Sequence, residues 1–234
     1  MSFKIVNYYD HIKKEDKAMY HYPNEAQINI SLPARLLVCG PSGTGKTNVI
    51  LNLMKGIGIW DKVIILAKDL EEPLYKHVIE VYRKLEKKHK VQILLAISSV
   101  NDMPDLDKDF DPKENTLLIC DDLICENAKD LTKLEPFWVR GRKKSITMAF
   151  LAQGYFDVPK KIRKNSNYVI LKKISNPLDL GRILKEYALD ISKDKMRSMY
   201  DYAMQGDAHT SFFMLDALTK KEELKYRANF DPII

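Results

Sequence analysis

Residues 40–47 constrain the fold of this chain more than any other segment, because the loop they form needs a strand before it and a helix after it. Their sequence, Gly-Pro-Ser-Gly-Thr-Gly-Lys-Thr, matches the pattern G-x-x-x-x-G-K-[ST] at every fixed position. The run Leu-Leu-Val-Cys at residues 36–39 predicts a buried strand, and residues 48–54 continue as a helix. The sequence therefore predicts a strand, a phosphate-binding loop and a helix in direct succession.

The loop predicts a site for ATP and Mg²⁺. Its glycines let the backbone amides curl around the β-phosphate at the positive end of the following helix. Lys46 would reach the β- and γ-phosphate oxygens, and Thr47 would ligate Mg²⁺. The expected nucleotide contacts are the consecutive residues Gly40, Pro41, Ser42, Gly43, Thr44, Gly45, Lys46, Thr47 and Asn48.

A second apolar run, at residues 116–122, ends in two carboxylates with the sequence Thr-Leu-Leu-Ile-Cys-Asp-Asp. We expect Asp121 to hold Mg²⁺, usually through water, and Asp122 to polarise the water that attacks the γ-phosphate. Two alternatives stay open. Glu126 could serve as the base if the strand end turns back, and Asp122 could instead cap the segment that follows.

The strand predicted at residues 146–153 ends in an amide side chain, Gln153. If this strand lies between the strand before the loop and the strand before Asp121, Gln153 points at the γ-phosphate and can orient water or report hydrolysis. Such an inserted strand marks motor-type ATPases, whereas the two strands are neighbours in simple kinases and GTPases. Gln153 could also be an ordinary polar surface residue.

Arg140 and Arg142 precede that strand and therefore lie at the opposite end of the sheet from the phosphates of their own subunit. This position favours an arginine that acts in trans, on the ATP of an adjacent subunit in a ring. We favour Arg142 slightly over Arg140. Contact with a DNA backbone, or a solvated basic turn, is nearly as consistent with the pattern.

Residues 139–173 contain ten lysines and arginines against a single acidic residue, Asp157. Such a surface would bind a polyanion independently of its sequence, because neutralised phosphates release counterions. A solvated charged surface is the alternative. The candidate DNA contacts are Lys143, Lys144, Lys160, Lys161, Arg163 and Lys164.

The remaining pattern predicts an α/β fold with a mostly parallel sheet covered by helices on both faces. The expected strands are Arg35–Cys39, Lys62–Ala67, 91–96, Thr116–Asp121, 146–153, 168–172 and a late strand at 210–215. The expected helices are 46–54, Pro73–His89, 129–139, 178–187 and Lys193–Ala203.

With 234 residues, the chain is long enough for one α/β domain and only marginally long enough for two. We expect one ATPase domain at residues 31–234, whose part from 176 onward is helical with the late strand. Residues 1–30 are predicted to be an extension that packs on the core or on a neighbouring subunit, and residues 98–115 an exposed connection.

Three features predict a cytosol-like compartment. The cysteines, Cys39, Cys120 and Cys125, are odd in number and favour reduced thiols. No apolar run approaches the roughly 18 residues of a membrane span, so we expect no membrane partner. The first residues resemble neither a signal peptide nor a transit peptide, so we expect no secretion.

The order of these features resembles the viral genome-packaging ATPases of the poxvirus A32-like group, within the FtsK/HerA superfamily. The matching features, which cover residues 33–187, are the proline-led strand and loop, the run Leu-Leu-Ile-Cys-Asp-Asp, the run Arg-Gly-Arg-Lys, the strand ending in Gln153, and the segment 158–171. The last of these, Val-Pro-Lys-Lys-Ile-Arg-Lys-Asn-Ser-Asn-Tyr-Val-Ile-Leu, is more specific than the Walker motifs.

The resemblance implies a RecA-like P-loop core, a homo-oligomeric ring of five or six subunits, and ATP-driven translocation of double-stranded DNA. It also implies a capsid or portal partner, and work in the host cytoplasm and the virion. Two features depart from the superfamily pattern. Asp122 stands where Glu is common, and no separate DNA-binding or nuclease domain fits in the length, so pore loops of the core would hold the DNA.

Two other functions share the phosphate-binding loop. A small-molecule kinase would have lid arginines, an acceptor pocket, and the two Walker strands side by side. A nucleotide-gated scaffold would bind ATP or DNA without turnover.

Overall fold

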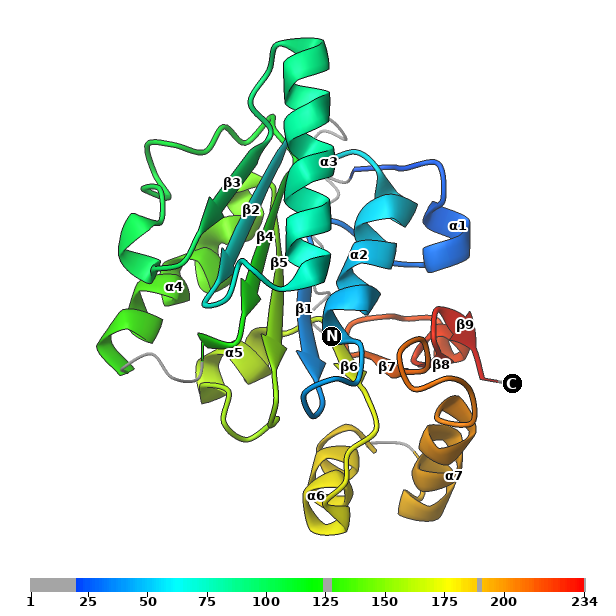
Figure 1. Cartoon of the computed structure of the whole chain (residues 1–234). Coiled ribbons are helices and arrows are strands. Elements are labelled where there is room, and N and C mark those ends of the chain that lie inside the picture. Colours follow the sequence, from blue (N-terminus) through cyan, green and yellow to red (C-terminus); the bar gives the residue numbers. More distant parts are fainter. Residues whose placement is uncertain (1–19, 124–127, 189–190, 234) are drawn as a thin grey trace, which may run out of the picture.

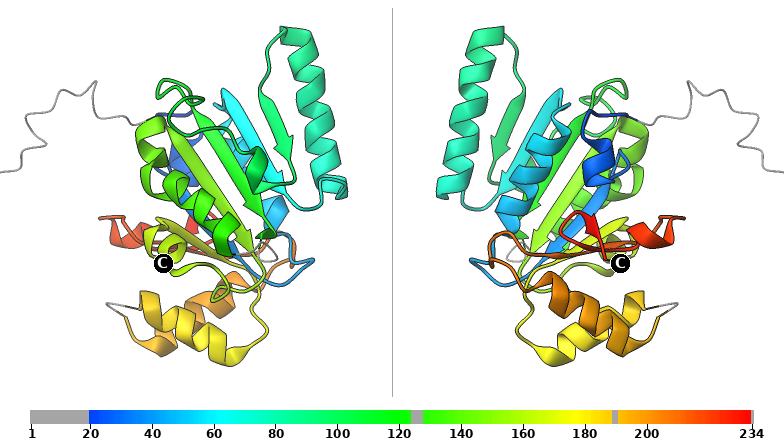
Figure 2. Two further views of the ribbon diagram at one scale, coloured as in Figure 1. Left: turned by 90° about the vertical axis from the view of Figure 1, so that its left-hand side faces the viewer. Right: turned by 90° about the vertical axis from the view of Figure 1, so that its right-hand side faces the viewer.

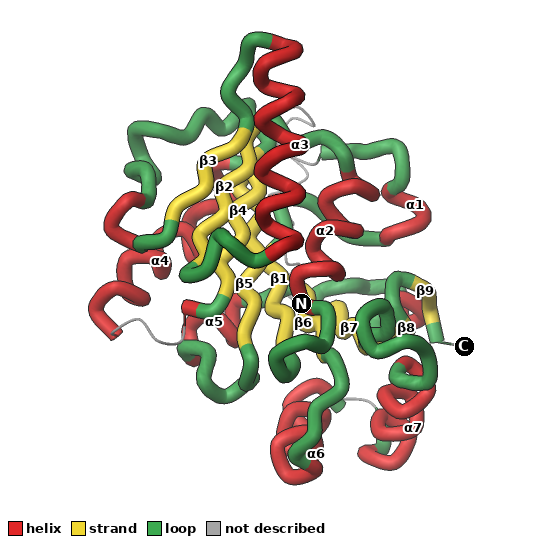
Figure 3. Tube along the Cα trace, viewed as in Figure 1, coloured by secondary structure: helices red, strands yellow, loops and turns green. Residues whose placement is uncertain are grey.

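A nine-stranded sheet forms the centre of the computed structural model, which describes residues 20–123, 128–188 and 191–233 (Figures 1 and 3). Its strands are β1 (Arg35–Cys39), β2 (Lys62–Ala67), β3 (Leu94–Ile97), β4 (Thr116–Asp121), β5 (Ile146–Ala152), β6 (Tyr168–Leu171), β7 (Phe213–Asp216), β8 (Tyr226–Ala228) and β9 (Asp231–Pro232). Their order is β3-β2-β4-β5-β1-β6-β7-β8-β9. In this order, each strand from β3 through β2, β4, β5 and β1 to β6 runs parallel to the next. The pairs β6–β7, β7–β8 and β8–β9 are antiparallel.

The strand β5 lies between β1 and β4, as the sequence predicts for a motor-type ATPase. In the register of these strands, Cys39 pairs with Ala152 and Asp121 pairs with Leu151. The backbone N–H of Gly40 also donates to the carbonyl oxygen of Ala152, at 3.1 Å. The loop, the two aspartates and Gln153 therefore leave the sheet at one edge. In a simple kinase β1 and β4 would be neighbours, whereas here β5 separates them.

Helices cover both faces of the sheet, as the two side views in Figure 2 show. The helices α2 (Lys46–Ile57) and α3 (Pro73–His89) lie on one face, and α4 (Ala128–Arg140) and α5 (Lys160–Asn165) lie on the other. The helices α6 (Pro177–Tyr187) and α7 (Lys193–Ala203) lie beyond the carboxyl ends of the parallel strands, at the bottom of Figure 1. The short α1 (Glu25–Ile28) lies beside α2.

Apolar side chains alternate between two cores along each parallel strand. In β1, Leu36 and Val38 pack toward α2 and α3, whereas Leu37 and Cys39 pack toward the face of α4. All four side chains have no exposed surface. Burial on both faces explains why these strands are apolar at nearly every position.

Several predicted bounds were wrong. The helix predicted at 46–54 continues to Ile57, where Gly58 ends it with φ +67°. The strand predicted at 91–96 begins only at Leu94, and the late strand is Phe213–Asp216 rather than 210–215. The short elements α1, α5, β8 and β9 were not predicted, because so few residues show no periodicity.

The connection at residues 98–115 is not simply exposed, contrary to the prediction. Val100, Leu106 and Phe110 are buried in the core beside α4. The rings of Phe110 and Phe137 meet edge to face, with centroids 5.6 Å apart. Apolar residues at wide spacing in an acidic segment thus anchor the connection to the domain.

Residues 20–30 pack on the core, whereas residues 1–19 of the predicted extension lie outside the described residues. The Tyr22 hydroxyl donates to the carbonyl oxygen of Ile30 at 2.7 Å, and the side chains of Ile28 and Ile30 are buried with those of α2. Cys39 and Cys120 are buried thiols, and Cys125 is not among the described residues. No described helix is both long and apolar enough to cross a bilayer.

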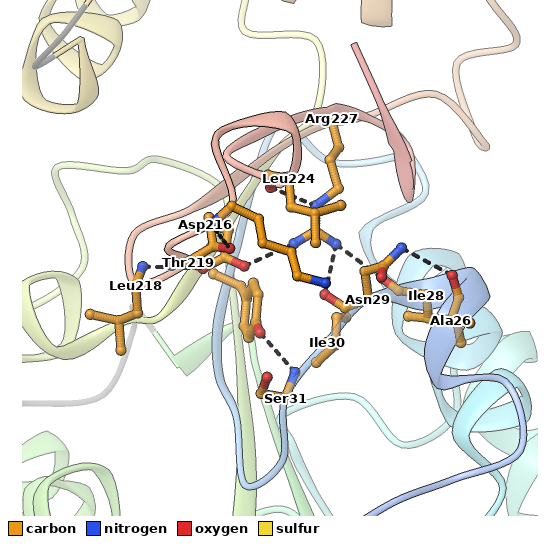
Figure 4. Close-up of polar contacts among 12 residues, drawn as sticks. Ala26, Ile28, Asn29, Ile30, Ser31, Asp216, Leu218, Thr219, Leu224 and Arg227 are labelled. Atoms are coloured by element: carbon orange, nitrogen blue, oxygen red, sulfur yellow. Dashed lines mark hydrogen bonds and ion pairs between the residues drawn. The ribbon is translucent and has the colours of Figure 1, made fainter. Parts of the chain in front are cut away.

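One buried arginine joins this N-terminal segment to the last strands (Figure 4). Arg227 has no exposed surface, and its Nη2 donates to Oδ2 of Asp216 at 3.0 Å. Its Nη1 donates to the carbonyl oxygens of Ile28 and Asn29, at 3.0 and 2.9 Å. Its Nε donates to the carbonyl oxygen of Leu224 at 2.9 Å. One guanidinium therefore satisfies acceptors from both ends of the described chain.

Replacing this arginine should destabilise the fold strongly. We expect Arg227→Met to lower the free energy of unfolding by about 3 to 5 kcal/mol, because the Asp216 carboxylate would be left buried without its partner. Arg140→Ala is the matched control, since it removes an exposed ion pair. The side chain of Arg140 is 54% exposed, and that of its partner Asp107 is 63% exposed. That variant should cost at most about 1 kcal/mol. Chemical denaturation measures both, and equal losses would contradict this role for Arg227.

Candidate nucleotide-binding site

The phosphate-binding loop connects β1 to the N-terminus of α2. Gly43 and Gly45 have φ values of +74° and +83°, in the left-handed region that glycine adopts without strain. The Lys46 ammonium donates to the carbonyl oxygens of Gly40 and Pro41, at 2.9 and 3.1 Å. The ammonium therefore lies within the curl of the loop, at the positive end of the helix, where an anion binds most favourably.

A cavity of about 380 Å³ opens over this loop. This volume is within the range of small-molecule sites. The predicted residues that line it are Ser42, Gly43, Gly45, Lys46, Thr47, Asp121, Asp122 and Gln153. Gly40, Pro41, Thr44 and Asn48 belong to the same loop and helix start but do not line this cavity.

Thr47 and Asp121 are brought together by Tyr75, which the sequence did not single out. The Tyr75 hydroxyl donates to Oδ2 of Asp121 at 2.5 Å, and the Thr47 side chain lies next to it. Burial raises the pKa of Asp121, while the hydrogen bond from Tyr75 and the charge of Lys46 oppose the rise. A hydroxyl and a carboxylate at one point are oxygen ligands of the kind that Mg²⁺ prefers.

Asp122 and Gln153 are linked directly at the open side of the cavity. Nε2 of Gln153 donates to Oδ1 of Asp122 at 3.2 Å, and both side chains are exposed. Asp122 has φ +50°, a conformation that costs energy in a residue other than glycine and is concentrated at functional sites. The alternative base, Glu126, and the segment that Asp122 would cap lie at residues 124–127, outside the described residues.

The cavity is also lined by residues that the sequence analysis missed, and the polar or charged ones among them are Lys68, Asp69, Glu72, Tyr75 and His209. Lys68, Glu72 and Tyr75 follow β2, which pairs with β4, so parallel order places them at the same edge as Asp121. The charged run after β2 was the signal available in the sequence. Burial raises the pKa of Glu72, and the nearby charges of Asp121 and Asp69 add to this rise.

Neither predicted arginine lies at this site. Arg142 lines a separate cavity of about 530 Å³ at the other edge of the sheet, together with Asn167 and Asp216. Arg140 pairs with Asp107 at 3.3 Å. The lining of the nucleotide cavity, all within the described ranges, includes no arginine.

In the basic stretch at residues 139–173, some side chains contact other residues of the chain and others are exposed without such contacts. Lys144 donates to the carbonyl oxygens of Asp107 and Phe110, and Lys161 pairs with Glu135 at 2.6 Å. The Arg163 side chain is only 17% exposed, and its guanidinium lies over the rings of Tyr155 and Phe156. Lys172, counted in the stretch, has no exposed surface at all. The exposed candidates without such contacts are Lys143, Lys160 and Lys164.

The parallel sheet with an inserted strand, the glycine-rich loop at a helix start and the neighbouring aspartates define a P-loop NTPase. The chain belongs to the family of the poxvirus A32 protein, whose family model matches residues 24–222. The resemblance to viral packaging ATPases of this group is thereby confirmed.

Solved structures show the same fold at low sequence identity. The genome packaging NTPase B204 from Sulfolobus turreted icosahedral virus 2, in complex with sulfate, is 13% identical, with a TM-score of 0.56 over 86% of this chain and 97% of that one. The same protein in complex with ATP-gammaS gives 13% identity and a TM-score of 0.55, over 86% and 98% of the two chains. B204, the DNA-packaging ATPase from Sulfolobus turreted icosahedral virus, gives 15% identity and 0.52, over 79% and 93%. No curated protein sequence matches the chain significantly.

The two left-handed glycines of the loop should differ in their tolerance of alanine. A Cβ on Gly45 would lie 2.4 Å from the carbonyl oxygen of His209, whereas a Cβ on Gly43 meets nothing within 4 Å. We expect Gly43→Ala to lower the free energy of unfolding by about 1 kcal/mol, through the backbone conformation alone. Gly45→Ala should lower it by about 3 kcal/mol, because backbone must also move. Chemical denaturation measures both, and equal values would contradict the close approach of His209.

Proposed function

We propose that this chain hydrolyses ATP with Mg²⁺ and uses the energy to translocate double-stranded DNA into a viral capsid. The position of β5 carries the proposal, because it places Gln153 beside Asp122 over the phosphate-binding loop. Membership of the A32 family supports it, as does a fold shared with a protein described as a genome packaging NTPase. The proposed setting is the host cytoplasm, and the proposed partners include a capsid or portal component.

ATP binding would use the loop amides and Lys46. The ammonium would exchange its bonds to Gly40 and Pro41 for phosphate oxygens. Thr47 and Asp121 would hold Mg²⁺, and Tyr75 would keep the Asp121 carboxylate in place. Bound Mg²⁺ would neutralise charge that develops on the β- and γ-phosphate oxygens.

Attack by water would depend on the pair at the open side of the cavity. Asp122 would accept a proton from the attacking water, and Gln153 would orient that water through its amide. The 3.2 Å hydrogen bond between these two side chains would link Asp122, which polarises the water, to Gln153, which senses the γ-phosphate. Glu72 is another carboxylate that lines the same cavity, and it competes with Asp122 for the role.

A ring of subunits would complete the site. The cavity supplies Lys46 to the phosphates but no arginine among its lining residues. Arg142 lies at the opposite edge of the sheet and lines a cavity there, so it would reach the ATP of a neighbouring subunit. Arg140 is the weaker candidate, since its guanidinium already pairs with Asp107. We propose a homo-oligomeric ring of five or six subunits.

DNA contact would come from the basic stretch. The exposed Lys143, Lys160 and Lys164 are the main candidates, with Lys144, Lys161 and Arg163 contributing where their internal contacts are exchanged for phosphate. Contacts of this kind are independent of base sequence and weaken with salt. No separate DNA-binding domain is required for them.

Substitution of Asp122 tests the hydrolytic step. We expect wild-type protein to release phosphate from ATP, with stimulation by double-stranded DNA. Asp122→Asn should lower kcat by about a hundredfold or more while ATP binding persists, because the amide cannot accept the proton. Steady-state phosphate release and nucleotide titration measure the two effects.

Glu72→Gln is the matched control for this experiment, as it neutralises another carboxylate that lines the cavity. A loss of kcat with Glu72→Gln but not with Asp122→Asn would move the base to Glu72. If wild-type protein releases no phosphate with or without DNA, at concentrations that form rings, the motor function is excluded. The chain would then be a nucleotide-gated scaffold.

Mixed rings test the trans arginine. Arg142→Ala and Lys46→Ala should each be inactive alone, the first for lack of an arginine and the second for lack of phosphate binding. When the two variants are mixed, part of the ATPase activity should return. The Arg142→Ala subunit keeps an intact phosphate-binding loop, and its Lys46→Ala neighbour supplies Arg142.

An arginine that acts within its own subunit would give no recovery on mixing. Arg140→Ala serves as the control, since its loss should leave ATP hydrolysis near the wild-type rate. The role would instead belong to Arg140 under two conditions. Arg140→Ala alone would have to lack ATPase activity, and mixing it with Lys46→Ala would have to restore part of that activity.

A further inference from the structure

The order of strands determines which way a nucleotide lies in the cavity. Asp121 follows β4 and Gln153 follows β5, and both strands lie on one side of β1. The metal and the γ-phosphate belong on that side. On the other side of β1 lies β6, which runs parallel to it. A triphosphate whose γ end faces β4 and β5 therefore directs its nucleoside toward β6.

The loop at residues 207–210 lies next to β7, the neighbour of β6 in the sheet, and contributes one residue to the lining of the cavity. This loop precedes β7, and the exposed His209 within it lines the cavity. The backbone N–H of His209 donates to Oδ1 of Asp207 at 2.9 Å, which shapes the turn. Two further hydrogen bonds shape it, because the carbonyl oxygen of Asp207 accepts from the N–H groups of Thr210 and Ser211, at 3.1 and 2.8 Å.

Two side chains from distant elements hold this loop against the phosphate-binding loop. Nδ2 of Asn48, in the first turn of α2, donates to the carbonyl oxygen of His209 at 3.3 Å. Nζ of Lys172, directly after β6, donates to the same oxygen at 3.2 Å. Lys172 is fully buried. It packs closely on Gly40, because a Cβ added to Gly40 would lie only 2.5 Å from the Cβ of Lys172. The position of His209 is thus tied to both ends of the phosphate-binding loop.

We infer that residues 207–210 form the nucleoside-facing wall of the ATP site and that the His209 ring packs on the purine base. Asn48 and Lys172 fix the backbone of His209 and leave its imidazole free to meet the base. Flat aromatic rings, histidine included, are common stacking partners of nucleobases. The inference rests on the proposed ATP binding and adds the residue that recognises the nucleoside.

Two ligands that differ only by the nucleoside provide the test. Full-length wild-type protein and variants are titrated calorimetrically with AMP-PNP and with inorganic tripolyphosphate, both with Mg²⁺. We expect His209→Ala to weaken AMP-PNP binding about tenfold, equivalent to about 1.4 kcal/mol, and to leave tripolyphosphate binding unchanged. His209→Phe, which keeps a flat ring, should retain the affinity for AMP-PNP.

Two further variants serve as the negative and the positive control for these titrations. His89→Ala removes an exposed histidine from the last turn of α3 and should change neither affinity. Lys46→Ala should weaken both ligands, because it acts on the phosphates. Equal weakening of both ligands by His209→Ala, no weakening of either, or failure of His209→Phe to restore binding would overturn the inference. Failure of the wild-type protein to bind AMP-PNP would instead overturn the proposed function.

Discussion

The parallel pairing of β5 between β4 and β1 is the constraint on which the site depends. Parallel strands present their carboxyl ends at one edge, and the register of these three strands sets Gly40, Asp122 and Gln153 side by side. A shift of one residue in either pair would turn the side chains of β5 to the opposite face. The two apolar cores prevent such a shift, because every residue of β5 is buried.

The edge of the sheet that carries the cavity is supported from parts of the chain that are distant in sequence. Tyr75 reaches Asp121 from α3. Lys172, directly after β6, and Asn48, in α2, both donate to the carbonyl oxygen of His209. At the other edge, Arg227 joins the last strands to the N-terminal segment. Each of these contacts uses a side-chain donor to satisfy an acceptor on another element, so the elements are fixed relative to one another.

Prediction from the sequence succeeded where a signal is local. The loop at 40–47 and the aspartates after the run 117–120 are short contiguous patterns, and the structure brings both to one cavity with Gln153. Glu72, Tyr75 and His209 were missed, because their place at that cavity depends on strand order and on a loop more than 160 residues after the phosphate-binding loop. The burial of Lys172 was missed because a charge count does not distinguish a surface lysine from a buried one.

The sequence by itself determined the nucleotide loop, the apolar strands of a doubly covered sheet and the residue types available for metal and water. Those features follow from local backbone chemistry and from the periodicity of side chains. Only the tertiary structure decided which residues share the cavity, that the predicted arginines lie at the far edge, and that His209 from a late loop lines the cavity. These depend on strand pairing between distant segments, which is set by the packing of the whole domain rather than by any single stretch of chain.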